Sequence, residues 1–211
     1  YYVQKEKKRL YFRKSTPAKK IQKYYRALSM EQDRRSPHHY FNSVKEVTGK
    51  VFVDVGCAEG YSSLEIIEEA KHVYLFEQDE QWLEAIRATF EPWQDKVTIV
   101  QKYVSDHNSS REQTLDDFFN NQTNEHLFLK MDIEGAERHA LAGCNNLFQN
   151  CQKLDFAICT YHLRDDEEVI SAFLDKHNCT YINQKGFFRH KIRSVVMRGS
   201  KKSVSYTHLT L

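Results

Sequence analysis

The chain has 211 residues, enough for one domain or for one domain with an extension. Its hydrophobic fraction of 40% and aromatic fraction of 13% provide for a sizeable core and exclude global disorder. No apolar stretch approaches the ~20 residues that span a bilayer. The five cysteines form an odd set without a C-x-x-C pair, so they indicate reduced thiols rather than a disulfide or zinc framework. We therefore expect a cytoplasmic location.

The net charge of +2 is unevenly distributed along the chain. Residues 1–35 contain 12 basic and 3 acidic residues, and residues 189–211 contain 6 basic and no acidic ones. Residues 36–188 consequently carry a net charge of −13. A basic arm of this kind can bind nucleic acid, an anionic membrane surface or a phosphorylated substrate. It can equally be a solvated extension that screens an acidic body, and this second interpretation is the one we favour.

The N-terminal segment, residues 1–36, is expected to be a basic, partly helical extension. The chain opens at Tyr1 without methionine, so we expect a preceding portion to be missing. Thr16-Pro17 is a typical helix start, and apolar side chains recur at helical spacing from Ile21 to Leu28. We expect the main domain over residues 37–202. Residues 203–211 are uncharged and resemble translated adapter sequence, so we expect a non-native tail without function.

The main domain alternates between strand and helix patterns, which predicts a doubly wound α/β fold. We expect a mostly parallel, seven-stranded sheet with helices on both faces. The last two strands have no helix between them, so they should form a C-terminal antiparallel hairpin. The predicted strands are 51–55, 73–77, 97–103, 126–131, 155–160, 180–184 and 192–198, and the predicted helices are 61–70, 79–90, 114–119, 136–142 and 165–177.

The most informative segment is V-F-V-D-V-G-C-A-E-G, residues 51–60. A β-branched apolar run ends in Asp54, passes through Gly56, Cys57 and Gly60, and leads into a helix pattern. Such a strand–loop–helix unit offers unpaired N–H groups to a nucleotide. The spacing D-x-G-x-x-x-G differs from the G-x-G-x-x-G of dinucleotide sites. A carboxylate in that position would repel a pyrophosphate and favours a positively charged ligand, such as an ammonium or a sulfonium.

Two further predicted strand ends contribute polar groups to the same ligand. Glu77 lies about twenty residues beyond the glycine loop, where an acidic residue accepts hydrogen bonds from ribose hydroxyls, and Gln78 follows it. After the next strand, Asp106 could accept a hydrogen bond from an adenine amino group, with Ser105 beside it. Each of these side chains could also be an ordinary polar loop residue.

The fourth strand end carries an unusual density of charge. The run L-K-M-D-I-E-G-A-E brings Lys130, Asp132, Glu134 and Glu137 together within eight residues. Carboxylates this close together are costly unless they are paired or solvated. A charged helix cap explains Glu137, because a carboxylate is favourable at a helix N-terminus. It does not explain Lys130 and Asp132, which we therefore expect to be functional.

Together, D-V-G-C-A-E-G and L-K-M-D-I-E-G-A-E resemble the FkbM family of S-adenosylmethionine-dependent methyltransferases. The resemblance runs from residues 37–41 to the last hairpin. It implies methylation of a hydroxyl on a sugar, a glycan or a secondary metabolite. Tyr161-His162, after the fifth strand, matches a Tyr-His of part of the family. The implied cofactor-binding residues are Asp54, Gly56, Cys57, Gly60, Glu77, Gln78, Ser105, Asp106 and Asp132.

An alcohol must lose its proton during methyl transfer, and a positioned base accelerates such a step. His162 is our first candidate for this base, because an unperturbed histidine titrates nearest to neutrality. Asp132 is the second candidate, and Lys130 completes the catalytic group. Glu134, Tyr161 and His162 are candidate acceptor contacts. We expect no metal, although Asp132, Glu134 and His162 could gather an oxygen-and-nitrogen site.

Other functions compete with this one. Enzymes that methylate the amino group of a base require a [D/N]-P-P-[Y/F] loop after the fourth strand, and residues 132–135 are Asp-Ile-Glu-Gly. An RNA ribose methyltransferase that uses the basic arm stays open, although nucleic acid is not the partner we expect. A catalytically silent binding module with the same fold also stays open. A dehydrogenase is disfavoured by the glycine spacing and by Asp54.

Overall fold

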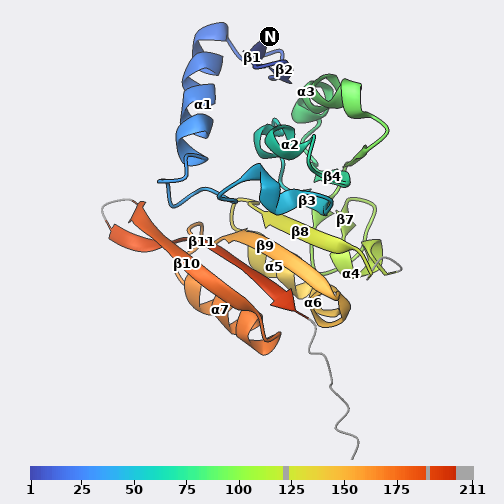
Figure 1. Cartoon of the computed structure of the whole chain (residues 1–211), viewed down its shortest axis with the longest axis vertical. Helices are drawn as coiled ribbons and strands as arrows, with labels where there is room; N and C mark the ends of the chain where they lie inside the picture. Colours follow the sequence, from blue (N-terminus) through green and yellow to red (C-terminus); the bar gives the residue numbers. More distant parts are fainter. Residues whose placement is uncertain (121–123, 189–190, 203–211) are drawn as a thin grey trace, which may run out of the picture.

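The computed structural model describes residues 1–120, 124–188 and 191–202. A single twisted sheet forms the centre of the molecule, with helices packed on both of its faces (Figure 1). This arrangement confirms the predicted α/β class. The proposed tail, residues 203–211, lies outside the described residues. Among the described helices, none combines the length and the apolar character that a membrane crossing requires.

The sheet has seven strands in the order β10-β11-β9-β8-β3-β4-β5. Strand β11 runs antiparallel to both β9 and β10, and the other neighbours are parallel. The predicted C-terminal hairpin is therefore confirmed. Chain winding reverses at β3, between β4 and β8, and ligands bind at such a switch point. The strands are β3 (Val51–Val55), β4 (His72–Phe76), β5 (Val97–Val100), β8 (His126–Met131), β9 (Lys153–Cys159), β10 (Thr180–Phe188) and β11 (Lys191–Lys202).

Two apolar cores lie on opposite faces of the sheet, as the alternation of side chains along a strand requires. In β3, Phe52 faces one core, whereas Val51, Val53 and Val55 face the other. The Phe52 side is covered by α1 (Ala18–Glu31), α2 (Tyr61–Ile66) and α3 (Glu80–Phe90). The opposite side is covered by α4 (Leu115–Phe118), α5 (Glu137–Ala142), α6 (Asn145–Asn150) and α7 (Asp166–Lys176).

Several element boundaries differ from the predictions. Strand β5 ends at Val100 because Lys102 N–H turns back to its carbonyl, and the following residues form a separate ladder of β6 (Tyr103–Val104) with β7 (Glu112–Gln113). Helix α2 ends at Ile66, where the chain already turns towards β4. The sequence analysis did not identify the hairpin β1 (Tyr2–Lys5) and β2 (Lys8–Tyr11), the 3-10 helices η1 (Val44–Val47) and η2 (Glu91–Trp93), or α6.

The basic N-terminal segment packs against acidic side chains of α2 and α3. Lys5 pairs with Glu65, and Lys14 pairs with Glu84. Arg13 Nη2 lies 2.6 Å from Asp79 Oδ2, at the N-terminus of α3. These contacts support the interpretation that the arm screens an acidic body.

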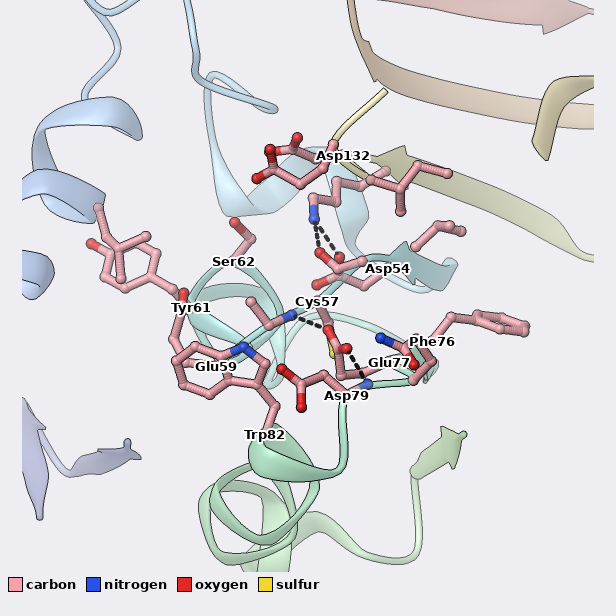
Figure 2. A pocket seen from close by; sticks show the side chains of 18 of the residues that line it. Asp54, Cys57, Glu59, Tyr61, Ser62, Phe76, Glu77, Asp79, Trp82 and Asp132 are labelled. Atoms are coloured by element: carbon pink, nitrogen blue, oxygen red, sulfur yellow. Dashed lines mark hydrogen bonds and ion pairs between the residues drawn. The ribbon is translucent and has the colours of Figure 1, made fainter. Parts of the chain in front are cut away.

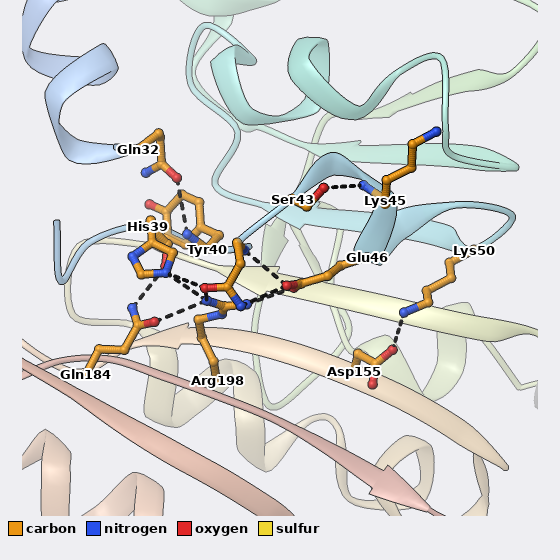
Figure 3. A network of polar contacts seen from close by, with 11 residues as sticks. Gln32, His39, Tyr40, Ser43, Lys45, Glu46, Lys50, Asp155, Gln184 and Arg198 are labelled. Carbon is orange, nitrogen blue, oxygen red and sulfur yellow. Dashed lines mark hydrogen bonds and ion pairs between the residues drawn. The ribbon is translucent and has the colours of Figure 1, made fainter. Parts of the chain in front are cut away.

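A buried polar network fixes the segment that enters β3 (Figure 3). Arg198 of β11 contacts His39 Nε2 at 2.9 Å and donates to Glu46 Oε2 at 2.7 Å. Gln184 of β10 donates to the carbonyls of Pro37 and His39, each at 3.0 Å. Residues 37–46 are thereby fastened to the C-terminal hairpin, next to the carboxyl edge of the central strands.

Candidate active site

A cavity of about 690 Å³ opens at the carboxyl ends of β3, β4 and β8. Its volume lies within the range of small-molecule and cofactor sites. Figure 2 shows Glu77 between the glycine loop and the start of α3, with Asp132 and Trp82 towards opposite ends of the pocket. The predicted site residues among its lining are Asp54, Gly56, Cys57, Glu77, Gln78, Lys130, Asp132, Glu134 and Tyr161.

The glycine loop is held close to the loop after β8. Gly56 has a φ of +77°, and a Cβ on it would lie 2.2 Å from the carbonyl oxygen of Asp132. Only glycine fits there, because both the dihedral and the neighbouring backbone exclude a side chain. Gly60 also has a positive φ, but its open side faces the ring of Phe90 and not the cavity. The structure therefore gives Gly60 a packing role, and its predicted cofactor contact gains no support from the cavity.

Glu77 is held by backbone donors on both sides. Its Oε2 accepts a hydrogen bond from Ala58 N–H at 3.1 Å, and its Oε1 accepts one from Asp79 N–H at 2.8 Å. Ala58 adopts a φ of +47°, which is unusual for a residue with a side chain. The strained loop thus orients a carboxylate whose remaining lone pairs are available to a ligand in the cavity.

Asp54 is not the free carboxylate that the sequence analysis assumed. Its Oδ1 lies 2.8 Å from Lys130 Nζ, and its Oδ2 accepts a hydrogen bond from Ser63 Oγ at 2.6 Å. Parallel pairing brings the two together, because Asp54 and Lys130 are register partners in β3 and β8. Lys130 also donates to the Gly56 carbonyl at 2.7 Å, so it fixes the loop. The expectation that Asp54 itself attracts a cationic ligand is corrected, because Lys130 already neutralises it.

Ser105 and Asp106 lie outside the cavity lining. The carboxylate of Asp106 instead contacts Nδ1 of His107 at 2.7 Å and Nδ1 of His139 at 3.4 Å. These contacts lower the pKa of Asp106. The predicted adenine contacts at Ser105 and Asp106 therefore gain no support from the cavity. From this part of the chain, Lys102, Tyr103 and Val104 line it.

One end of the cavity centres on Asp132. Its Oδ2 accepts a hydrogen bond from the Tyr40 hydroxyl at 2.7 Å, and its Oδ1 lies 3.5 Å from His162 Nε2. His162 is not part of the cavity lining, and its Nε2 reaches the cavity only through Asp132 Oδ1. Nδ1 of His162 lies 3.0 Å from Oε1 of the fully buried Glu137. Burial by itself lowers the pKa of His162. The hydrogen bond and charge of Glu137 outweigh this effect, together with the charges of Asp132 and Glu134, so the pKa of His162 is raised.

The loop that carries Tyr161 and His162 is clamped to α5. Asp166 is fully buried, and its Oδ2 accepts a hydrogen bond from Leu163 N–H at 2.6 Å. Its Oδ1 accepts from Arg138 Nε at 2.7 Å. Because Arg138 follows Glu137 in α5, this pair holds the loop of His162 against the helix that carries Glu137.

Several cavity residues were missed by the sequence analysis, and most lie in the N-terminal segment. Arg13 stacks on Trp82 with its guanidinium carbon 4.0 Å from the ring centre, and Tyr24 donates to Glu59 Oε2 at 3.1 Å. These contacts join α1 and the preceding loop to the end of the cavity near Trp82. Tyr40 lay in a segment that the resemblance covers, but no residue pattern marked it as a partner of Asp132.

Comparison with known proteins identifies the family of the chain. The sequence profile of the "Methyltransferase FkbM domain" matches residues 28–187. The chain belongs to the FkbM methyltransferase family. This membership confirms the predicted resemblance and the predicted cofactor, S-adenosylmethionine. No curated protein matches the sequence.

Solved structures show the same fold. An FkbM methyltransferase from Methylobacillus flagellatus KT is 17% identical, with a TM-score of 0.58 over 87% of this chain. This chain spans 55% of that protein's length. A putative methyltransferase from Streptococcus mutans, solved in complex with SAH, is 14% identical with a TM-score of 0.53. Here the match covers 75% of this chain and 93% of the other.

Proposed function

We propose that this FkbM-family chain transfers a methyl group from S-adenosylmethionine to a hydroxyl oxygen of a sugar, a glycan or a secondary metabolite. One observation carries the proposal. The glycine loop, the backbone-held Glu77 and the Asp132 group all meet in a single cavity of suitable volume. When bound, S-adenosylmethionine supplies an already activated methyl group on a sulfonium.

Within this proposal, Glu77 binds the ribose hydroxyls, because its oxygens are fixed by Ala58 and Asp79. Gly56, Cys57 and Gln78 line the same side. Lys102, Tyr103 and Val104 take the place that the sequence analysis gave to Ser105 and Asp106 near the base.

The acceptor hydroxyl would be bound near Asp132, Glu134 and Tyr161, which line the other end of the cavity. Positioning there can contribute ~7–11 kcal/mol. Asp132 lines the cavity and also faces His162, so we assign it the first contact with the departing proton. His162, 3.5 Å behind it, accepts that proton from Asp132 or stabilises its charge. Lys130 acts by positioning, through Asp54 and Gly56.

The basic arm provides the argument for an RNA ribose as acceptor. In this structure Lys5, Arg13 and Lys14 are already paired with acids of the body, which weakens that argument. Salt dependence separates the two acceptors, because phosphate-driven binding falls steeply as salt rises.

The donor site is tested by calorimetry with S-adenosylhomocysteine, the demethylated product. Glu77→Gln should weaken binding about 10- to 150-fold, the effect of ~1.5–3 kcal/mol for hydrogen bonds to a charged group. Glu80→Gln is the matched control, because Glu80 is exposed three residues further on, outside the cavity lining. Absence of binding by the unmodified chain at millimolar ligand would favour the silent module instead.

The acceptor is tested with isotope-labelled methyl donor against panels of sugar nucleotides, glycans, hydroxylated small molecules and RNA. We expect label to be incorporated into a hydroxylated non-nucleic-acid acceptor and to be lost in Asp132→Asn. Incorporation into RNA alone, with strong salt dependence, would replace the proposal by its RNA alternative.

A further inference from the structure

Asp132, Glu137 and His162 form a compact group beside the acceptor end of the cavity. They come from three places: the loop after β8, the first residue of α5, and the loop after β9. Each offers one ligand atom, and these atoms all lie within 4.8 Å of one another. Sequence spacing alone favoured Glu134 as the third member, but its side chain is 92% exposed, whereas that of Glu137 is fully buried.

The group contains most of the unsatisfied buried polar atoms in the described part of the chain. Six buried side-chain nitrogen or oxygen atoms have no hydrogen bond of regular geometry there, and four of them are Asp132 Oδ1, Glu137 Oε2 and both ring nitrogens of His162. The two ring nitrogens face Glu137 Oε1 and Asp132 Oδ1 only as ion-pair contacts, at 3.0 and 3.5 Å. The His162 side chain is only 9% exposed. Leaving a buried polar atom unpaired costs roughly 1–3 kcal/mol. Asp132 Oδ1 and Glu137 Oε2 leave hydrogen-bonding capacity unused in one group of three side chains, which indicates room for a further partner.

The net charge of the group indicates whether that partner is a cation or an anion. One imidazole faces the carboxylates of Asp132, Glu134 and Glu137 at 3.5, 3.7 and 3.0 Å. The positive charge of Lys130 also interacts with Asp132, but the direct partners of its ammonium group are Asp54 and the Gly56 carbonyl. Even with His162 protonated, the negative charge exceeds the positive charge. The further partner is therefore expected to be a cation.

We propose that Asp132, Glu137 and His162 bind a divalent transition-metal ion, with Mn²⁺ or Zn²⁺ as the representative ions. Two carboxylate oxygens and one imidazole nitrogen are a ligand set that such ions accept, and the nitrogen favours them over Mg²⁺ or Ca²⁺. Ligands ~2.1 Å from a common ion lie about 3 Å apart. The 3.0 Å separation joins Glu137 Oε1 to His162 Nδ1, and the 3.5 Å separation joins Asp132 Oδ1 to His162 Nε2. An ion would bind only one of these ring nitrogens, so the carboxylate that faces the other nitrogen would rotate towards the ion, over separations of at most 4.8 Å.

The catalytic meaning of this site rests on the proposed function, whereas ion binding itself does not. Asp132 lines the cavity, so an ion that it binds would be reachable by an acceptor hydroxyl. Coordination would lower the pKa of that hydroxyl and release its proton to water, as metal ions do for bound water. His162 would then act as a ligand and not as a free base.

Metal binding is tested on the full chain after chelator treatment and dialysis. Mn²⁺ is titrated in by calorimetry, and its electron paramagnetic resonance spectrum is recorded. We expect one Mn²⁺ per chain and a ¹⁴N coupling from the imidazole. Asp132→Asn, Glu137→Gln and His162→Ala should each weaken binding at least about tenfold, and His162→Ala should also remove the ¹⁴N coupling. Circular dichroism verifies that each variant is folded, and binding of S-adenosylhomocysteine verifies it further for Glu137→Gln and His162→Ala, which lie outside the cavity lining.

The control is His107→Ala. Nδ1 of His107 lies 2.7 Å from Asp106, and its Nε2 lies 2.7 Å from Glu112, in an exposed group that could bind Mn²⁺ adventitiously. We expect this variant to bind Mn²⁺ as the unmodified chain does. Loss of binding in His107→Ala with retention in Glu137→Gln would overturn the proposal, as would no binding of Mn²⁺ or Zn²⁺ at millimolar concentration. If the chain binds S-adenosylhomocysteine but no metal, only the metal site is refuted. If it binds the metal but no S-adenosylhomocysteine, only the proposed donor site is refuted.

Discussion

The ion pair between Asp54 and Lys130 joins the two strands that flank the switch point, and Lys130→Met tests its contribution to stability. Both side chains are almost completely buried, with exposures of 1% and 6%. Methionine keeps most of the apolar stem of lysine but removes its charge. It leaves Asp54 with the Ser63 hydroxyl and leaves the Gly56 carbonyl without the Lys130 donor.

Removing one partner of a buried pair costs ~3–5 kcal/mol, because the other charge stays buried without compensation. For a chain of this length, 1 kcal/mol corresponds to ~2–4 °C in Tm. We therefore expect Lys130→Met to lower the Tm by about 6–20 °C. Urea unfolding followed by circular dichroism gives the free energy directly. The variant should also bind S-adenosylhomocysteine more weakly, because the glycine loop loses its anchor.

Lys71→Met is the matched control. Lys71 pairs with Glu125 at 2.7 Å, but the two side chains are 55% and 37% exposed. An exposed pair contributes ~0–1 kcal/mol. A double variant, Asp54→Leu with Lys130→Met, should recover stability without recovering ligand binding. If Lys130→Met and Lys71→Met cost the same, the pair does not stabilise the fold in the way described.

Three further predictions concern the neighbouring groups. Burial raises the pKa of Glu59 to about 7, so the folded state holds a proton that the unfolded state has lost. Stability should consequently fall by up to about 3 kcal/mol as the pH rises from 5 to 8, and urea unfolding should show this slope disappear in Glu59→Gln. Gly56→Ala should abolish binding of S-adenosylhomocysteine in calorimetry, because the added Cβ would meet the Asp132 carbonyl. The control is Gly49→Ala, which should retain binding, because Gly49 has a similar φ of +71° but open space where its Cβ would lie. Tyr40→Phe removes the hydrogen bond to Asp132 and should cost about 1 kcal/mol in thermal unfolding; an unchanged Tm would argue against that bond.

The fold class could be read from the chain because its signals are local. The apolar run before Asp54, the glycines after it and the helical spacing that follows act within a few residues of one another. The strand ends at Glu77 and Asp132 were placed correctly for the same reason. The hairpin β1–β2 was missed because its strands are short and polar. It is also held by a contact with a distant residue, since Tyr11 N–H donates a hydrogen bond to the Thr89 hydroxyl of α3.

The chemistry of the site was decided by contacts between distant residues. The pairing of Asp54 with Lys130 follows from the parallel register of β3 and β8, and it reversed the role expected for Asp54. Glu137 was read as a helix cap, but the loop after β9 brings His162 against it. The sequence by itself determined that Asp54, Glu77, Lys130 and Asp132 reach the carboxyl edge of the sheet. Only the tertiary structure decided which of them are neutralised by a partner and which remain unsatisfied, because that depends on side-chain distances that residue spacing does not fix.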